Sequence, residues 1–201
     1  MKLNKINSYK SKLLKLKLIK TKIYKKNHNN FIKIEDISSR LKKVLHIIYN
    51  YHINNKRIIF IGVPIGIISK LSMLLKKTSH TVLPNSVWVS GLLTNQKACL
   101  KYLKNNPKFI GNKTSEVLMQ WLTKSDLIVV LDFFSNQDTI NEAYLVKIPI
   151  IALNCELDIL NAVFTYKIPG NFKFTNKKVG DIFFYSLLSR FGFRYYSYFI
   201  P

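Results

Sequence analysis

Residues 127–153 read LIVVLDFFSNQDTINEAYLVKIPIIAL, and the fold can be inferred outward from this stretch. Two apolar runs lie at its ends, LIVVLD and IPIIAL, and continuous runs of this length are typical of strands buried on both faces of a sheet. The residues between them, 136–147, have helical periodicity, with Ile140, Ala143 and Tyr144 expected on the inward face. The stretch therefore predicts a strand, a crossing helix and a second, parallel strand.

The same alternation continues toward the N-terminus. The run RIIFI at 57–61, ended by Gly62, and a shorter run at 80–83 predict two further strands. Helices are expected at residues 36–48 with Asp36 as the N-cap, 67–77, 114–123 and 178–190. Buried strands separated by amphipathic helices predict an α/β fold: a three-layer, Rossmann-like (flavodoxin-like) parallel sheet with helices on both faces.

The charge balance indicates a polyanionic partner. The chain has 32 Lys and Arg against 10 Asp and Glu, a formal net charge of +22. Solubility alone needs a net charge of only about 2 to 8 in a small domain. Nucleic acid fits this excess better than a small acidic substrate, although basic chains also bind anionic membrane surfaces. No window reaches the roughly 18 consecutive apolar residues that span a bilayer, so we expect no transmembrane segment.

The ends of the chain differ from its middle. Residues 1–30 carry many lysines and no Asp, Glu or Arg, and 191–201 form an aromatic and basic tail, so the folded domain is expected at 31–190. In the N-terminal extension Leu16, Ile19 and Ile23 recur at helical spacing between lysines, which predicts a helix formed against RNA. A mitochondrial transit peptide is the competing interpretation, but those favour Arg.

A nucleotide site finds little support in the sequence. The turn after the strand at 57–61 is GVPIG, whereas a dinucleotide fingerprint needs G-x-G-x-x-G. Pro64 and Ile67 stand where the second and third glycines would be. A phosphate-binding loop ending in G-K-[ST] is absent from the sequence as well. We therefore expect no nucleotide cofactor.

Catalysis and metal binding are not expected either. Asp132 ends a strand where α/β enzymes often place a carboxylate, but all four histidines lie at or before His80. Cys155 also follows a strand and has no histidine after it to act as a base. The histidines and the two cysteines lack the short spacings typical of metal ligands.

The segment SVWVSGLLTN, residues 86–95, combines an aromatic side chain, a glycine and small polar groups. Trp88 could stack on RNA or could be a core tryptophan. Gly91, Thr94 and Asn95 could form a helix start that presents backbone N–H groups to phosphate. The turn PGN at 169–171 could act similarly at a bend, and both features could equally be architectural.

The segment 86–95 resembles the small-subunit ribosomal protein S-two family, whose members carry a stretch close to R-W-L-G-G-M-L-T-N. Further matching segments follow the family's order along residues 31–190. The matches are Trp88, Gly91, Leu93, Thr94 and Asn95; IIFIG at 58–62; LIVVLD at 127–132; Glu142-Ala143; IPIIAL at 148–153 with Asn154-Cys155 and Asp158; and IPGN at 168–171. Together, in this order, they are far more specific than any one alone.

The resemblance implies a structural protein of the small ribosomal subunit, not an enzyme. It would bind small-subunit rRNA and neighbouring ribosomal proteins at the junction of head and body on the solvent side, close to the mRNA path, and would not be a homo-oligomer. Departures are Gly62-Val63-Pro64, where the family has G-T-K; Val87, where it has a basic residue; and Glu156-Leu157, where it has Asp-Pro. The family's long helical hairpin should be shortened or absent, because only about thirty residues separate Asn95 from Leu127.

Lysine-rich composition favours a mitochondrial over a plastid ribosome, with the protein in the matrix. The expected rRNA contacts are Lys12, Lys15, Lys20, Lys22, Lys25, Lys26, Trp88, Thr94, Asn95, Lys97, Asn171 and Lys173. Two alternatives stay open. One is a Rossmann-type nucleotide-binding enzyme without its glycine signature, and the other is a basic peripheral membrane protein held by its N-terminus.

Overall fold

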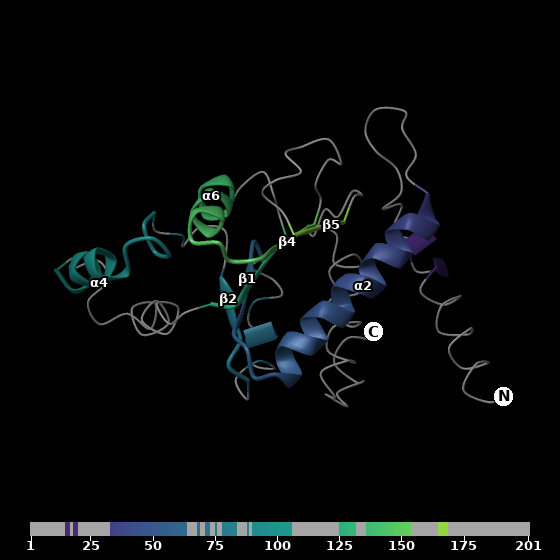
Figure 1. Ribbon diagram of the computed structural model, residues 1–201, viewed down its shortest axis with the longest axis horizontal. Coiled ribbons are helices and arrows are strands. Elements are labelled where there is room, and N and C mark those ends of the chain that lie inside the picture. Colours follow the sequence, from purple (N-terminus) through teal and green to yellow (C-terminus); the bar gives the residue numbers. More distant parts are fainter. Residues whose placement is uncertain are drawn as a thin grey trace.

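Five strands form one all-parallel sheet in a computed structural model of the chain (Figure 1). The structure describes residues 15–16, 18–19, 33–63, 68, 71–72, 75, 78–83, 88, 90–105, 125–131, 136–153 and 165–168. The strands are β1 (Ile58–Ile61), β2 (Thr81–Leu83), β3 (Leu127–Val130), β4 (Ile150–Leu153) and β5 (Tyr166–Ile168). Their order is β2-β1-β3-β4-β5, the flavodoxin-like order. The predicted α/β class is confirmed.

The helices whose bounds lie within the described residues are α2 (Ile34–Ile53), α4 (Gln96–Asn105) and α6 (Gln137–Leu145). The helices α2 and α6 lie on opposite sides of the strands, and α4 lies at the end of the molecule far from α2 (Figure 1). The residues described within the predicted helix at 67–77 are also helical. The predicted helices at 114–123 and 178–190 lie outside the described residues.

Strand register divides the sheet's side chains between two cores. Phe60 pairs with Val129, which pairs with Ile151, and this row faces the α2 side. The next row, which includes Ile128 and Ile150, faces the α6 side. All four positions are buried in each of β1, β3 and β4. Helices on both faces explain why these strands are apolar throughout instead of alternating.

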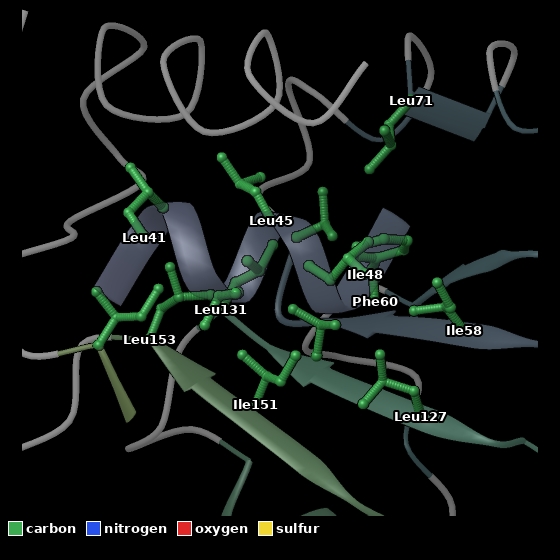
Figure 2. Packing of buried hydrophobic residues seen from close by; sticks show 14 of the residues in the cluster. Leu41, Leu45, Ile48, Ile58, Phe60, Leu71, Leu127, Leu131, Ile151 and Leu153 are labelled. Carbon is green, nitrogen blue, oxygen red and sulfur yellow. The ribbon is translucent and has the colours of Figure 1, made fainter. Parts of the chain in front are cut away.

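The larger core lies between the sheet and α2. Ile37, Leu41, Val44, Leu45 and Ile48 of α2 recur at helical spacing and are all buried. Figure 2 shows Leu41, Leu45 and Ile48 above Phe60 and Ile151 of the strands. Leu71 and Leu75 join the same cluster. On the other face, Leu92, Leu93, Cys99, Ile140 and Ala143 cover β1, β3 and β4.

Two details of the helices differ from the sequence predictions. The helix α2 begins at Ile34 with Lys33 as its N-cap, not at Asp36. Asp36 lies in the first turn beside Glu35, where carboxylates also stabilise the positive end of the helix dipole. In α6, Tyr144 was expected inward but is 50% exposed. Glu142 is buried instead, because its carboxylate is hydrogen-bonded from a neighbouring loop.

The N-terminal extension contacts the folded domain. Lys15, Leu16, Leu18 and Ile19 are helical, and Leu18 is 2% exposed in the core beneath α2. Leu16 and Ile19, which recur at helical spacing in the sequence, are 58% and 45% exposed. Leu18 is buried because the apolar cluster of the domain, and not periodicity within the extension, determines which side chain packs.

A pair of histidines joins three elements at one edge of the sheet. His52 Nδ1 in the last turn of α2 lies 2.9 Å from His80 Nε2, just before β2. The backbone N–H of Ile58, at the start of β1, donates to His80 Nδ1 at 3.3 Å. His80 Nδ1 must therefore be unprotonated and Nε2 must carry the hydrogen that His52 accepts. Burial, and secondarily His52, lowers the pKa of His80 to about 4.

This arrangement predicts loss of stability in mild acid. The pKa of His80 is about 4 in the folded chain, below its ordinary value of 6.5, so the unfolded chain takes up the proton first as pH falls. The contribution of neutral His80 to the free energy of unfolding is complete above pH 6.5 and declines as pH falls toward 4. Its upper limit is about 3 kcal/mol. Urea unfolding of wild type between pH 7.5 and 4.5 should show this slope, and His80→Gln should flatten it.

The matched control is His46→Gln, because His46 is an exposed residue of the same helix, α2. Its unfolding free energy should follow pH as the wild type does. Equal slopes for wild type and His80→Gln would contradict the assignment of the acid-sensitive step to this pair.

Candidate nucleic-acid interface

The loop 88–95 is attached to α6 through one buried carboxylate. Glu142, 9% exposed, accepts three hydrogen bonds. The Gly91 N–H donates to Oε1 at 2.6 Å and the Leu93 N–H to Oε2 at 3.1 Å. The indole N–H of Trp88 also donates to Oε1, at 3.4 Å. Removing a carboxylate from water costs free energy. Here several N–H donors replace its hydrogen bonds to water and offset that cost.

Gly91 fits this loop for two reasons. Its φ is +88°, a left-handed conformation that side chains with a Cβ rarely adopt. A Cβ at this position would also lie 3.3 Å from Cys99 Sγ. The Cys99 thiol is buried and lies 3.5 Å from the Ser90 carbonyl oxygen, its hydrogen-bond acceptor. Burial, and then the charge of Glu142, raises the pKa of Cys99, which disfavours the thiolate that a nucleophile needs.

The loop leads directly into α4. The Asn95 N–H donates to the Gly91 carbonyl at 2.7 Å, closing the turn. The Asn95 side-chain oxygen accepts from the Ala98 N–H at 3.4 Å, the position of an N-cap three residues before its donor. The direction in which α4 leaves the domain therefore depends on the loop, and the loop depends on Glu142.

These contacts correct one sequence expectation. The N–H group of Gly91, which could have faced phosphate, donates to Glu142 instead, and so does the N–H group of Leu93. Trp88 donates to the same carboxylate and packs, partly buried, against the α6-side core. The segment is thus architectural at these three residues, which is one of the two interpretations that the sequence left open. Thr94 and Asn95, also predicted contacts, are exposed.

Exposed basic residues follow the loop on the outer face of α4. This face consists of Lys97, Ala98, Lys101, Tyr102 and Asn105, all exposed. At about 100° per residue they occupy roughly 140° of the helix surface. The helix contains no Asp or Glu. Lys97 was predicted as a contact, whereas Lys101 and Tyr102 were missed, although the absence of acid and the i, i+4 lysine spacing indicate them.

A second basic surface lies on the opposite side of the sheet. Lys42, Lys43 and His46 of α2 are exposed, while the apolar positions of the same helix are buried. The N-terminal end of α2 differs, because Glu35 accepts from Lys15 Nζ at 3.1 Å. A backbone hydrogen bond, and then Lys15, lowers the pKa of Glu35. Lys15, predicted to contact RNA, is therefore paired within the chain.

The remaining predicted contacts lie outside the described residues. These are Lys12, Lys20, Lys22, Lys25, Lys26, Asn171 and Lys173.

Among the described residues, buried apolar side chains follow the two strands at the edge where a sheet of this order usually binds a nucleotide. That place is the carboxyl edge between β1 and β3, where the direction of strand addition reverses. Val63 after β1 and Leu131 after β3 are 2% and 0% exposed in the α2-side core. The Gly62 N–H donates to the Leu83 carbonyl at 3.2 Å, so this amide is not available to a phosphate.

The described residues contain neither a cluster of metal ligands nor a membrane-spanning helix. Within the described ranges no three His, Cys, Asp or Glu side chains gather as a metal site would require. The pair His52 and His80 falls short of such a set, and His80 Nδ1 faces the Ile58 N–H where a metal-bound imidazole would need a hydrogen-bond acceptor. No described helix is both long and apolar enough to cross a bilayer.

No family model matches the chain, and no curated protein matches it. The functional interpretation therefore depends on the residues and contacts described above.

Glu142 should be the most sensitive polar position of the loop. Glu142→Leu leaves the N–H groups of Gly91 and Leu93 without an acceptor, so we expect a loss of about 2–4 kcal/mol in unfolding free energy. Glu142→Gln keeps one acceptor oxygen and should lose less. Amide hydrogen exchange at Gly91 and Leu93 should accelerate in both variants. Glu35→Gln, at an exposed carboxylate, is the control, and an equal effect there would contradict the assignment.

Proposed function

We propose that this chain is a structural constituent of the small subunit of a mitochondrial ribosome, belongs to the ribosomal protein S-two family and binds small-subunit rRNA at the junction of head and body. The observation that carries the proposal is the contact between loop 88–95 and Glu142. Both segments were matched to the family separately from sequence, and the Gly91 bond joins them across 51 residues. Chance matches would have no reason to meet in a shared hydrogen-bond network.

The fold adds support of a coarser kind. A five-stranded parallel sheet with helices on both faces is the architecture that the family resemblance implies. The apolar Val63 and Leu131 at the usual nucleotide site favour a structural role over the alternative of a nucleotide-binding enzyme.

Charge supplies the binding mechanism. Exposed lysines on α2 and α4, which belong to the two helical layers, would neutralise rRNA phosphates. The apolar sheet between the layers would hold these lysines at fixed relative positions. Phosphate contacts orient a protein on RNA without reading base sequence. Salt cations such as K⁺ would compete with these lysines for the phosphates, so affinity should fall steeply with salt.

Sedimentation of organelle extract tests the function directly. The full-length chain, tagged and expressed in mitochondria, should co-sediment with the small subunit and should return to the top of the gradient after RNase digestion. A chain that remains at the top of the untreated gradient contradicts the proposal. Pelleting with anionic liposomes after nuclease treatment would identify the peripheral membrane protein instead.

Salt dependence tests the α4 lysines. Binding of the purified chain to small-subunit rRNA is measured between 50 and 300 mM KCl for wild type, Lys97→Gln and Lys101→Gln. Each variant should reduce the slope of log affinity against log salt by roughly 0.7–0.9, the effect of one phosphate contact. Lys147→Gln, an exposed lysine just after α6, is the matched control. Unchanged slopes for both α4 variants would remove this face from the interface.

A further inference from the structure

We infer that the outer face of α4 binds an unpaired stretch of RNA, with the ring of Tyr102 stacked on a base and Lys97 and Lys101 placed against the adjoining phosphates. This inference rests on the proposed function and specifies the form of RNA that this face accepts. It concerns Tyr102 in particular, a residue that packing does not explain.

The ring of Tyr102 is open to solvent. It is 55% exposed, although an aromatic side chain on a helix of this kind usually packs toward the core. Cys99, three residues earlier, takes that position and is 6% exposed beside Leu92 and Ile140. The residues next to Tyr102 along the outer face are Ala98 and Asn105, both exposed and neither a bulky apolar group. Among the described residues of α4, Tyr102 is thus an exposed aromatic ring without a bulky apolar neighbour on its face.

The surroundings of this ring are cationic. The ten residues of α4 include three lysines and no acidic residue. Lys97 and Lys101 lie one turn apart on the same face, and both are exposed. An open ring on the same helix face as cationic side chains is the combination by which proteins bind single strands, because bases stack on the ring while the cations follow the backbone.

The ring and the lysines differ in what they recognise. Phosphates are present on paired and unpaired RNA, so lysines alone would bind both forms. In a duplex the bases stack on one another and present only their edges, so an aromatic ring finds a base face only where RNA is unpaired. Tyr102 therefore predicts preference for a loop, bulge or single strand.

Tyr144 offers a contrast within the same chain. It is exposed to a similar extent, 50%, but it is followed by Leu145 and Val146, at 70% and 41%. No lysine lies within α6. Tyr144 thus has apolar neighbours and only Lys147 beyond the end of its helix, so it is a control of similar exposure without lysines on its own helix.

Two RNA probes separate stacking from charge. Affinity of the full-length chain is measured by fluorescence anisotropy for a labelled 12-nucleotide single strand and for the blunt duplex of the same sequence. Tyr102→Leu should weaken single-strand binding by about fivefold to a hundredfold and leave duplex binding unchanged. Tyr102→Phe, which keeps the ring, should stay within about twofold of wild type. Tyr144→Leu should bind both probes as wild type does.

The outcomes distinguish this inference from the proposed function. If wild type binds both probes and Tyr102→Leu loses nothing on the single strand, or loses equally on both, the stacking role is overturned while rRNA binding stands. If wild type binds neither probe, both fail. Thermal unfolding of Tyr102→Leu should match wild type closely, since surface substitutions rarely change the free energy by more than about 0.5 kcal/mol. A variant that unfolds early is replaced by Tyr102→Gln.

Discussion

The buried carboxylate of Glu142 determines how the basic end of the molecule is built. Removing a carboxylate from water is costly, and here the cost is offset by N–H groups of Trp88, Gly91 and Leu93. The bonds hold the loop in a conformation that only a glycine suits at position 91. The closed turn then places Asn95 as the cap of α4. The buried Glu142 of α6 thereby helps to position the exposed lysines of α4.

Sequence reasoning succeeded where burial alone decides the outcome. The runs at 58–61, 127–130 and 150–153 are strands because short, continuously apolar runs of this kind suit a sheet covered on both faces. Periodicity likewise identified the core face of α2. Prediction from sequence failed where a polar group or a distant contact decides which side chain is buried. Tyr144 was expected on the inward side of α6, but Glu142 is the buried residue, because its carboxylate is hydrogen-bonded by the loop at residues 88–95.

The candidate site was predicted less well, for the same reason. Trp88 and Gly91 were identified as special, but their partner lies about fifty residues away and no local pattern names it. Conversely, no sequence pattern identifies Lys101 and Tyr102, because their distinguishing property is that both side chains are exposed. Leu18 shows the same limit, since the spacing within its own segment favours Leu16 and Ile19. Long-range contacts, which a single sequence encodes only weakly, decide each of these cases.

Charge links the stability of this domain to its partner. The ten acidic residues cannot neutralise 32 cationic ones, and among the described residues the one ion pair joins Lys15 to Glu35. The excess of exposed lysines therefore makes the free chain repel itself. Salt relieves this repulsion and should stabilise the free domain, while the same salt weakens attachment to RNA. Bound phosphates would resolve the conflict, because they supply counter-charge at fixed positions and stabilise the folded form by mass action. On this argument the lysines oppose the isolated fold and support the assembled one.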